Sequence, residues 1–193
     1  MDVLNATEAR NVPLYGYGFK SFTLSMIEAA LEIGKGECRP EWIREILGFT
    51  REILRSEVEL LPHVLETLEA LKDRYTLMLI TKGELSEQER KISSSDLAGY
   101  FTHIDILGDK SSDAYRDVLG TYGIEPSRFV MIGNSLRSDI LPVVALGGRG
   151  VYIPCETSWV YEQVPDHQAA AASYEQLEHI GLLPDLIDSM SGV

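Results

Sequence analysis

The polar residues at the ends of apolar runs in this sequence carry groups that can bind phosphate or another small anion. Thr81 ends one such run and is followed by Lys82 and Gly83, which place a hydroxyl, an ammonium and backbone N–H groups at one turn. Lys110 follows a second run, where its ammonium can neutralise a phosphate or a nearby carboxylate. Taken singly, both have a commoner explanation: Thr81 as a helix cap beside a turn glycine, and Lys110 as a solvated loop lysine.

A third polar segment follows the apolar run that ends at Gly133. A compact loop there presents Asn134, Ser135, Ser138 and Asp139 before the next helical pattern begins. Mg²⁺ takes a few oxygen ligands from a protein and retains several waters, and such a loop can supply these ligands. The competing interpretation is that Asp139 only caps the helix that follows it.

The elements that must position these segments alternate between strand and helix. Short apolar runs are typical of buried parallel strands, and the segments between them have helical periodicity. The predicted strands are 75–81, 103–107, 129–133 and 150–154, the predicted helices between them are 84–97, 112–122 and 139–146, and a last strand is expected at 169–174 before a C-terminal helix. This alternation predicts an α/β fold with an open parallel sheet. Ligands of such sheets bind beyond the carboxyl ends of the strands, so the tips after Thr81, Leu107 and Gly133 are expected to form the site.

A helical unit precedes the first predicted strand. The segment 21–33 carries apolar residues at helical spacing, and a second helix begins at 39–41, where Pro40 suits a first turn. The apolar face expected for the first helix consists of Phe22, Met26, Ile27, Ala30 and Ile33. A third helix opens at 61–64 and is expected to turn Val64, Leu65, Leu68 and Leu71 inward.

In order and spacing, Thr81, Asp109-Lys110 and the segment 133–139 resemble the second, third and fourth motifs of the haloacid dehalogenase superfamily of hydrolases. The resemblance extends from about residue 61 to 162. It implies a Rossmann-like parallel sheet with helices on both faces as a core at 61–193. It also implies a helical cap at 1–60 that closes over the site and selects the substrate.

For activity, the resemblance implies a Mg²⁺-dependent phosphatase of a small phosphorylated metabolite, because phosphate-monoester hydrolysis is the family's commonest activity. Thr81 would then hydrogen-bond a phosphate oxygen, and Lys110 would stabilise the nucleophile and the phosphoryl charge. Asp139 would hold Mg²⁺ together with Asn134, which stands where most relatives carry an acidic residue. The substrate-binding residues that we predict are Lys82, Gly83 and Ser135.

The family's first motif, an apolar strand ending in Asp-x-Asp-x-Thr, is not found in this sequence. Its first aspartate would be the nucleophile and its second the general acid and base. The segment 2–7 has an aspartate and a threonine, but Leu4 replaces the second aspartate and no strand precedes Asp2. We therefore expect Met1 to lie inside or just before the cap of a longer ancestral protein.

Loss of the nucleophile strand has a structural consequence, since the resemblance places it between the strands ending near Thr81 and Gly133. Two inner strand edges would be unpaired and an apolar gap would open between them. We expect these edges to be re-paired by direct contact, by an N-terminal segment or by another chain. The last case would make the protein a homo-oligomer.

Two functions from different classes remain open. The first is a phosphatase that transfers phosphoryl groups through an aspartyl-phosphate in its complete form and is inactive as the present chain. The second is a non-catalytic module that binds phosphate or metal. A nucleotide-binding domain has little support, because no Gly-x-Gly-x-x-Gly turn or Gly-x-x-x-x-Gly-Lys loop occurs in the right context. The segment 15–20 is interpreted as a linker, with a substrate loop as the alternative.

Composition excludes several classes of partner. The net charge of −13 argues against nucleic acid and anionic membranes, which would be repelled over much of the surface. The two cysteines, Cys38 and Cys155, are far apart and suggest neither a disulfide framework nor a zinc site. The sequence contains no apolar run long enough to span a bilayer, and its first residues do not resemble a signal peptide, so we expect a cytoplasmic protein.

Overall fold

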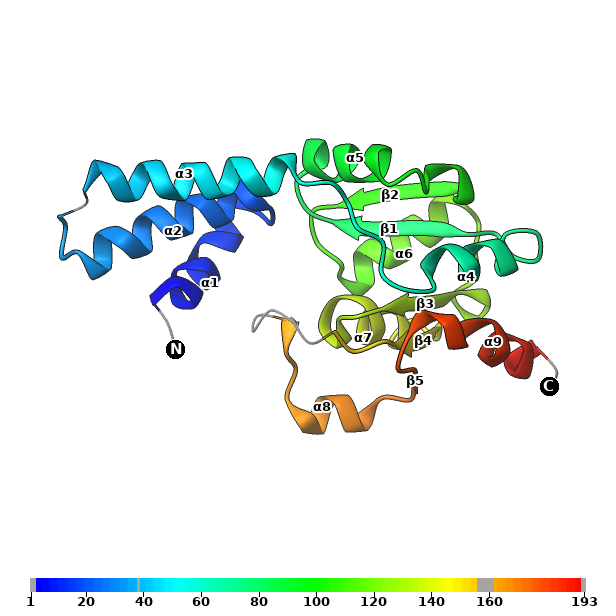
Figure 1. The fold of residues 1–193 in the computed structure, drawn as a ribbon. Coiled ribbons are helices and arrows are strands. Elements are labelled where there is room, and N and C mark those ends of the chain that lie inside the picture. Colours follow the sequence, from blue (N-terminus) through cyan, green and yellow to red (C-terminus); the bar gives the residue numbers. More distant parts are fainter. Residues whose placement is uncertain (1–2, 38, 156–161, 192–193) are drawn as a thin grey trace.

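The computed structural model describes residues 3–37, 39–155 and 162–191. Three helices, α1 (Val3–Tyr15), α2 (Phe19–Ile33) and α3 (Pro40–Arg55), form a helical unit to one side of an α/β unit (Figure 1). The periodicity predicted α2 and α3 but not α1, which has no distinct apolar face and contains Pro13. Among all the described residues, no helix is long and apolar enough to cross a membrane.

The most buried side chains of the helical unit are largely polar, which the apolar face predicted for residues 21–33 did not anticipate, although Phe22, Met26, Ile27 and Ala30 are half-buried. The buried face of α2 includes Ser21, Ser25 and Ala29, one turn apart, whereas Ile33 is 67% exposed. Asn11 of α1 donates from Nδ2 to Ser25 Oγ over 3.1 Å. Small residues at this spacing allow two helices to pack closely, and side-chain hydrogen bonds satisfy the polar groups that become buried.

The α/β unit alternates helices and strands in the order that the sequence predicts. Its strands are β1 (Met78–Lys82), β2 (His103–Leu107), β3 (Val130–Gly133), β4 (Arg149–Tyr152) and β5 (Glu175–Gln176). Its helices are α4 (Val64–Leu71), α5 (Leu85–Ser94), α6 (Ser112–Thr121), α7 (Leu141–Val144), α8 (Asp166–Ala171) and α9 (Leu183–Ser191). Short 3₁₀ turns lie at Ala98–Tyr100, Pro126–Arg128 and Ile180–Leu182, and a π-helical turn lies at Leu136–Ile140.

Two predicted details of this unit are wrong. Leu65, expected to face inward, is 46% exposed, and the buried Thr67 instead donates its hydroxyl to the Ile180 carbonyl oxygen over 3.2 Å. Residues 169–171, expected to begin a strand, end helix α8, and the last strand is only the two residues of β5. Alanine has the highest helix propensity, which accounts for the helix at the alanine run.

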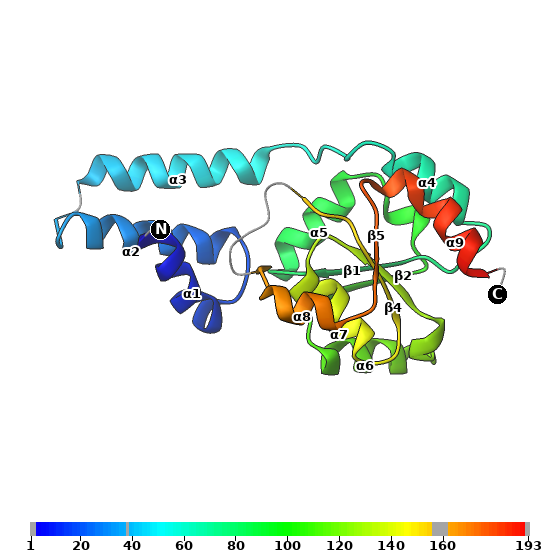
Figure 2. The ribbon, with the colours of Figure 1, turned by 90° about the horizontal axis from the view of Figure 1, so that it is seen from below.

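All strand pairs are parallel, and helices cover both faces, as the sequence predicts. β1 pairs with β2 from Met78 opposite His103 to Lys82 opposite Leu107. β3 pairs with β4, which in turn pairs with β5. Figure 2 shows α4 and α9 on one side of the strands and α6 and α7 on the other. The fold is therefore of the α/β class with a Rossmann-like arrangement of parallel strands and helices.

The strands form two separate sheets, and within the described residues β1 has no partner on the edge that faces away from β2. The Leu77 carbonyl and the Gly83 N–H both bond to the β2 segment, so the odd-numbered residues of β1 direct their backbone groups toward β2. Backbone groups alternate along a strand, so the even-numbered residues point to the opposite edge. These residues are Met78, Ile80 and Lys82.

The facing edge of β3 is also unpaired in the described part of the chain. The carbonyl oxygens of Phe129 and Gly133 accept from the β4 segment, which leaves the backbone groups of Val130 and Ile132 directed away from β4. The prediction that β1 and β3 re-pair directly or through an N-terminal segment is therefore wrong, because residues 3–15 form α1 instead. Pairing with another chain stays a prediction. We refer to the region between these two edges as the slot.

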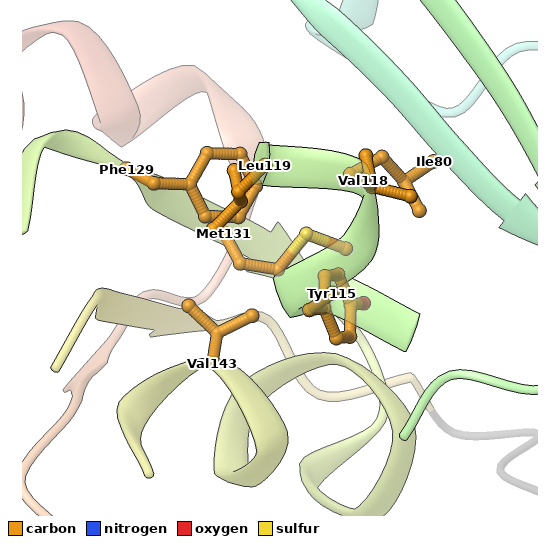
Figure 3. Close-up of a cluster of buried hydrophobic side chains, with 7 residues drawn as sticks. All are labelled: Ile80, Tyr115, Val118, Leu119, Phe129, Met131 and Val143. Carbon is orange, nitrogen blue, oxygen red and sulfur yellow. The ribbon is translucent and has the colours of Figure 1, made fainter. Parts of the chain in front are cut away.

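Apolar side chains pack between the two sheets, which share no strand pairing among the described residues. In one cluster, α6 contributes Tyr115, Val118 and Leu119, which pack with Ile80 of β1 and Met131 of β3 (Figure 3). A second cluster lies under α4 and α9. At the end where the strands begin, a cavity of about 750 Å³ opens between the segments that lead into β1 and β3. Its apolar lining includes Leu77, Met78, Phe129, Val130 and Ile187.

Candidate functional site

The Lys110 ammonium and the Asp139 carboxylate form a buried ion pair beyond the carboxyl ends of β2 and β3. Nζ donates to Oδ1 over 2.7 Å, and the two side chains are only 9% and 7% exposed. The Ser135 N–H donates to Oδ2 over 3.0 Å, so both carboxylate oxygens have a donor. Removal of either charge would leave the other buried without its counter-ion, which is costly in a protein interior.

The chain around Asp139 folds tightly because Gly133 has no side chain. A β-carbon on Gly133 would lie 2.3 Å from Asp139 Oδ2, closer than any real contact. The following loop is closed by Ser135, whose Oγ accepts from the Ser138 N–H over 2.9 Å. The π-helical turn at Leu136–Ile140 then places Asp139 back against the strand end. Such turns are frequent at functional sites.

Tyr115 of α6 supports this loop from below. Its side chain is fully buried, and its hydroxyl donates to the Ser138 carbonyl oxygen over 3.1 Å. Burial raises the pKa of the Tyr115 phenol well above its ordinary value, and the nearby Asp139 charge raises it further. Tyr115 is therefore held as a neutral hydrogen-bond donor.

A second carboxylate, that of Glu162, lies among donors from two strand ends. It accepts from Ser138 Oγ over 2.6 Å, from the Ser135 hydroxyl and from the Lys82 ammonium. Lys82 Nζ also donates to Ser138 Oγ over 2.6 Å. Burial alone would raise the pKa of the Glu162 carboxyl, but the hydrogen bonds from Lys82, Ser135 and Ser138 outweigh it and hold the pKa below its ordinary value. Glu162 is thus bound as an anion.

The segment between α1 and α2 reaches the same cluster. Lys82 Nζ lies 4.2 Å from the centroid of the Tyr17 ring, a cation–π contact. Next to it, the Phe19 N–H donates to Glu87 Oε2 of α5 over 2.9 Å. Within residues 15–20, for which the sequence favoured a linker, Tyr17 and Phe19 therefore contact the core near the carboxyl end of β1.

Several predicted site residues come together in the structure. Lys110 contacts Asp139 directly, as above. Lys82 and Ser135, predicted as substrate-binding residues, both contact Glu162. Because Lys82 is the last residue of β1 and Ser135 follows β3, this cluster spans the carboxyl end of the slot.

Other predicted residues are placed differently. The Thr81 hydroxyl donates to Gln88 Oε1 of α5 over 3.1 Å rather than to any residue of the ion pair. Gly83 has a φ of 143°, which favours glycine, and its N–H donates to the β2 segment. Asn134 is exposed at the start of the polar loop. The phosphate-binding role of Thr81 and Gly83 and the metal-binding role of Asn134 stay predictions.

Glu162 is the site residue that sequence reasoning missed. It belongs to no motif, and the sequence around it has no periodicity that would assign it to an element. Its position after β4 is a topological signal, because a segment that follows a parallel strand starts at the carboxyl end of the sheet, where ligands bind. Gly16 and Gly18 on either side of Tyr17 indicate a turn there, but nothing in the sequence indicates that Tyr17 contacts Lys82.

The described residues do not by themselves fit a Mg²⁺ ion. Mg²⁺ needs octahedral oxygen ligands and is usually held by one or two free carboxylates. Among the described residues no group of three or more His, Cys, Asp or Glu side chains could hold a metal. Asp139 is the one buried carboxylate of the polar loop, and its oxygens already face Lys110 and Ser135. A Mg²⁺ site here would require a further carboxylate close to Asp139.

Comparison with known proteins assigns the family. The family model described as haloacid dehalogenase-like hydrolase matches residues 6–147. A haloacid dehalogenase-like family hydrolase from Xanthomonas campestris, known from a crystal structure, is similar to this chain. The two are 36% identical in sequence, and their structures superpose with a TM-score of 0.85 over 98% of this chain and 76% of that one. The chain therefore belongs to the haloacid dehalogenase-like hydrolases. It matches none of the curated proteins with which it was compared.

More distant solved structures share the fold. A predicted phosphoglycolate phosphatase from Haemophilus somnus is 16% identical, with a TM-score of 0.64, over 96% of this chain and 90% of that one. A 2-haloacid dehalogenase from Pseudomonas syringae is 20% identical, with a TM-score of 0.60, over 97% of this chain and 80% of that one. At these identities the likeness concerns the fold alone.

Proposed function

We propose that this chain forms the larger part of a Mg²⁺-dependent phosphatase that acts on a small phosphorylated metabolite through an aspartyl-phosphate. We propose also that residues 1–193 alone do not turn substrate over. One observation supports the proposal above all: the Lys110–Asp139 pair and the Lys82–Ser135–Ser138 donors lie together at the carboxyl end of the slot. A phosphoryl group placed there would meet the Lys82 ammonium and the hydroxyls of Ser135 and Ser138.

The slot supports the proposed inactivity of the chain, because a nucleophile-bearing strand would fit into it. A strand running parallel to β1 and β3 in the slot would hydrogen-bond to both free edges and end beside Lys110 and Asp139. An aspartate at that end would form a bond to phosphorus as the ester oxygen leaves and takes a proton from a second acid. The same aspartates would add the carboxylates that the described residues lack for Mg²⁺.

The site residues of this chain each have a role in the proposed reaction. Lys110 holds Asp139 and would lie next to the attacking carboxylate, where its charge offsets the repulsion between nucleophile and phosphate. Lys82 and the two loop serines would bind non-reacting phosphate oxygens, because an ammonium and hydroxyls donate to them. Tyr17 would close the site from the helical unit and keep Lys82 in place.

A non-catalytic anion-binding module is the second candidate, and the state of the two carboxylates favours it. Asp139 is neutralised by Lys110 and Glu162 by Lys82, so the site is electrostatically complete in the present chain. Such a site would bind an external anion without any reaction. This function needs no strand in the slot.

Turnover of p-nitrophenyl phosphate separates the two candidates. The present chain should show none, and a version extended at its N-terminus by an apolar strand ending in Asp-x-Asp-x-Thr should show Mg²⁺-dependent turnover. The matched control carries Asn in place of the first aspartate and should be inactive. If the extended chain binds inorganic phosphate but remains inactive, the module is supported. Turnover by the present chain that survives Lys110→Ala and Asp139→Ala would contradict both.

A further inference from the structure

Glu162 lies where an anionic ligand of this site would lie. Its carboxylate accepts from Lys82 at the end of β1 and from Ser135 and Ser138 after β3, so it bridges the two sides of the slot. It reaches this position from the segment that follows β4, 27 residues beyond Ser135 in the chain. Its side chain is 13% exposed, and that of Lys82 is 17% exposed.

The donors around Glu162 have the composition of an anion site. One ammonium and two hydroxyls converge on its two oxygens, and charged acceptors form the strongest hydrogen bonds with such donors. A phosphate or carboxylate group of a substrate would use the same donors. The internal carboxylate and an external anion cannot both accept these hydrogen bonds.

We propose that Glu162 is an internal ligand of this anion site, and that an anionic substrate binds by displacing its carboxylate from Lys82, Ser135 and Ser138. This inference rests on the proposed function, because it requires the cluster to bind an external anion. It makes Glu162 a determinant of affinity that holds the free site together and weakens binding by competition. It also favours substrates whose anionic group reaches deep enough to replace the carboxylate.

Competition has a measurable size. When a site is open for only a fraction of the time, its apparent affinity falls by that fraction. Glutamine keeps the shape of Glu162 but loses the charge that Lys82 binds, so the site should be open far more often in Glu162→Gln. We expect this variant to bind inorganic phosphate roughly tenfold more tightly than the unmodified chain, which corresponds to about 1.4 kcal/mol.

The test is calorimetric titration of the unmodified full chain and of Glu162→Gln with inorganic phosphate at pH 7. Glu178→Gln is the matched control, because it removes the same charge from an exposed position outside the cluster. Tighter binding in Glu162→Gln alone is the expected result. Equal or weaker binding in Glu162→Gln would overturn the inference while leaving the anion site of the proposed function intact. Failure of all three proteins to bind phosphate would instead reject that anion site, and the inference with it.

A second measurement uses only the unmodified chain, in case the variant does not fold. Displacement of Glu162 should speed amide hydrogen exchange at residues 162–164 when phosphate is added, although ligands usually slow exchange near their site. Phosphate binding that leaves exchange at 162–164 unchanged or slower would show that the carboxylate stays in place, and would overturn the inference.

Discussion

Gly133 and Asp139 pack so closely that a β-carbon on the glycine would lie 2.3 Å from the aspartate Oδ2 and 2.5 Å from its Cβ. The last residue of β3 and the acidic residue six positions later are thus in direct contact. This contact holds the carboxylate toward Lys110 and the Ser135 N–H. The position of the ion pair therefore depends on the absence of a side chain at Gly133.

Gly133→Ala should destabilise the fold and move Asp139. Overpacking at a filled position costs about 1–3 kcal/mol, because the neighbouring side chain must leave its preferred rotamer. Urea unfolding measures the loss. Gly120→Ala is the control, because a β-carbon at Gly120 in α6 meets nothing within 4 Å. This control should be neutral or stabilising by up to about 1 kcal/mol. Similar losses in the two variants would contradict the close contact.

The Lys110–Asp139 pair should show strong coupling in a double-mutant cycle. Removing one partner of a buried pair costs about 3–5 kcal/mol, since the other charge is left buried and uncompensated. Lys110→Met and Asp139→Asn should therefore each destabilise the chain, and the double variant should lose much less than the sum. The free energies of unfolding come from urea denaturation.

An exposed pair gives the reference for this cycle. Arg44 and Glu41 lie 3.0 Å apart in α3, with side chains 72% and 64% exposed. Their coupling should be about 0–1 kcal/mol, because solvent screens the charges. The buried-pair account fails if Lys110 and Asp139 couple no more strongly than this surface pair.

Stability should fall at alkaline pH partly through Tyr115. Its pKa is raised in the folded state by burial, and the Asp139 charge raises it further, so the folded chain keeps the proton where the unfolded chain loses it. The contribution is complete below the ordinary tyrosine pKa of about 10 and is lost as pH rises above it. Thermal unfolding from pH 8 to pH 11 should show a steeper decline for the unmodified chain than for Tyr115→Phe.

The same substitution has an effect at neutral pH. Tyr115→Phe loses the hydrogen bond to the Ser138 carbonyl oxygen, which should cost about 1 kcal/mol. Parallel declines of the two proteins between pH 10 and pH 11 would argue against a raised pKa for Tyr115.

Amide exchange should alternate along β1. The N–H groups of Leu79 and Thr81 point toward β2, whereas those of Met78, Ile80 and Lys82 point into the slot. Unpaired amides exchange faster, so the even-numbered residues should lose protection first. A strand added at the N-terminus should then protect them and leave the odd-numbered residues unchanged. Uniform protection along β1 in the present chain would mean that the slot is already filled.

Much of the α/β core could be predicted from sequence, because buried parallel strands are short apolar runs bounded by glycine and polar turn residues. β2 was predicted at 103–107 and is observed there. The contact between Lys110 and Asp139 agrees with the rule that strand tips converge. The helical unit was harder, since its buried face uses serine, threonine and asparagine, and hydrophobic periodicity does not register such an interface.

Two features required coordinates. Glu162 reaches the site from a segment without a motif, so only the folded chain brings it to Lys82. The open slot was expected to close, because unpaired inner edges are costly. Instead, the apolar cluster around α6 bridges the two sheets and holds them together without strand pairing.

The carboxyl end of the slot is proposed to bind an anion at Lys82, Ser135 and Ser138, in the place of Glu162. The most direct measurement is a crystal structure of the chain soaked with tungstate, a heavy phosphate analogue whose position is unambiguous. We predict tungstate within hydrogen-bond distance of Lys82 and Ser135, with Glu162 moved away. Tungstate bound only elsewhere, with Glu162 still on Lys82, would contradict the claim.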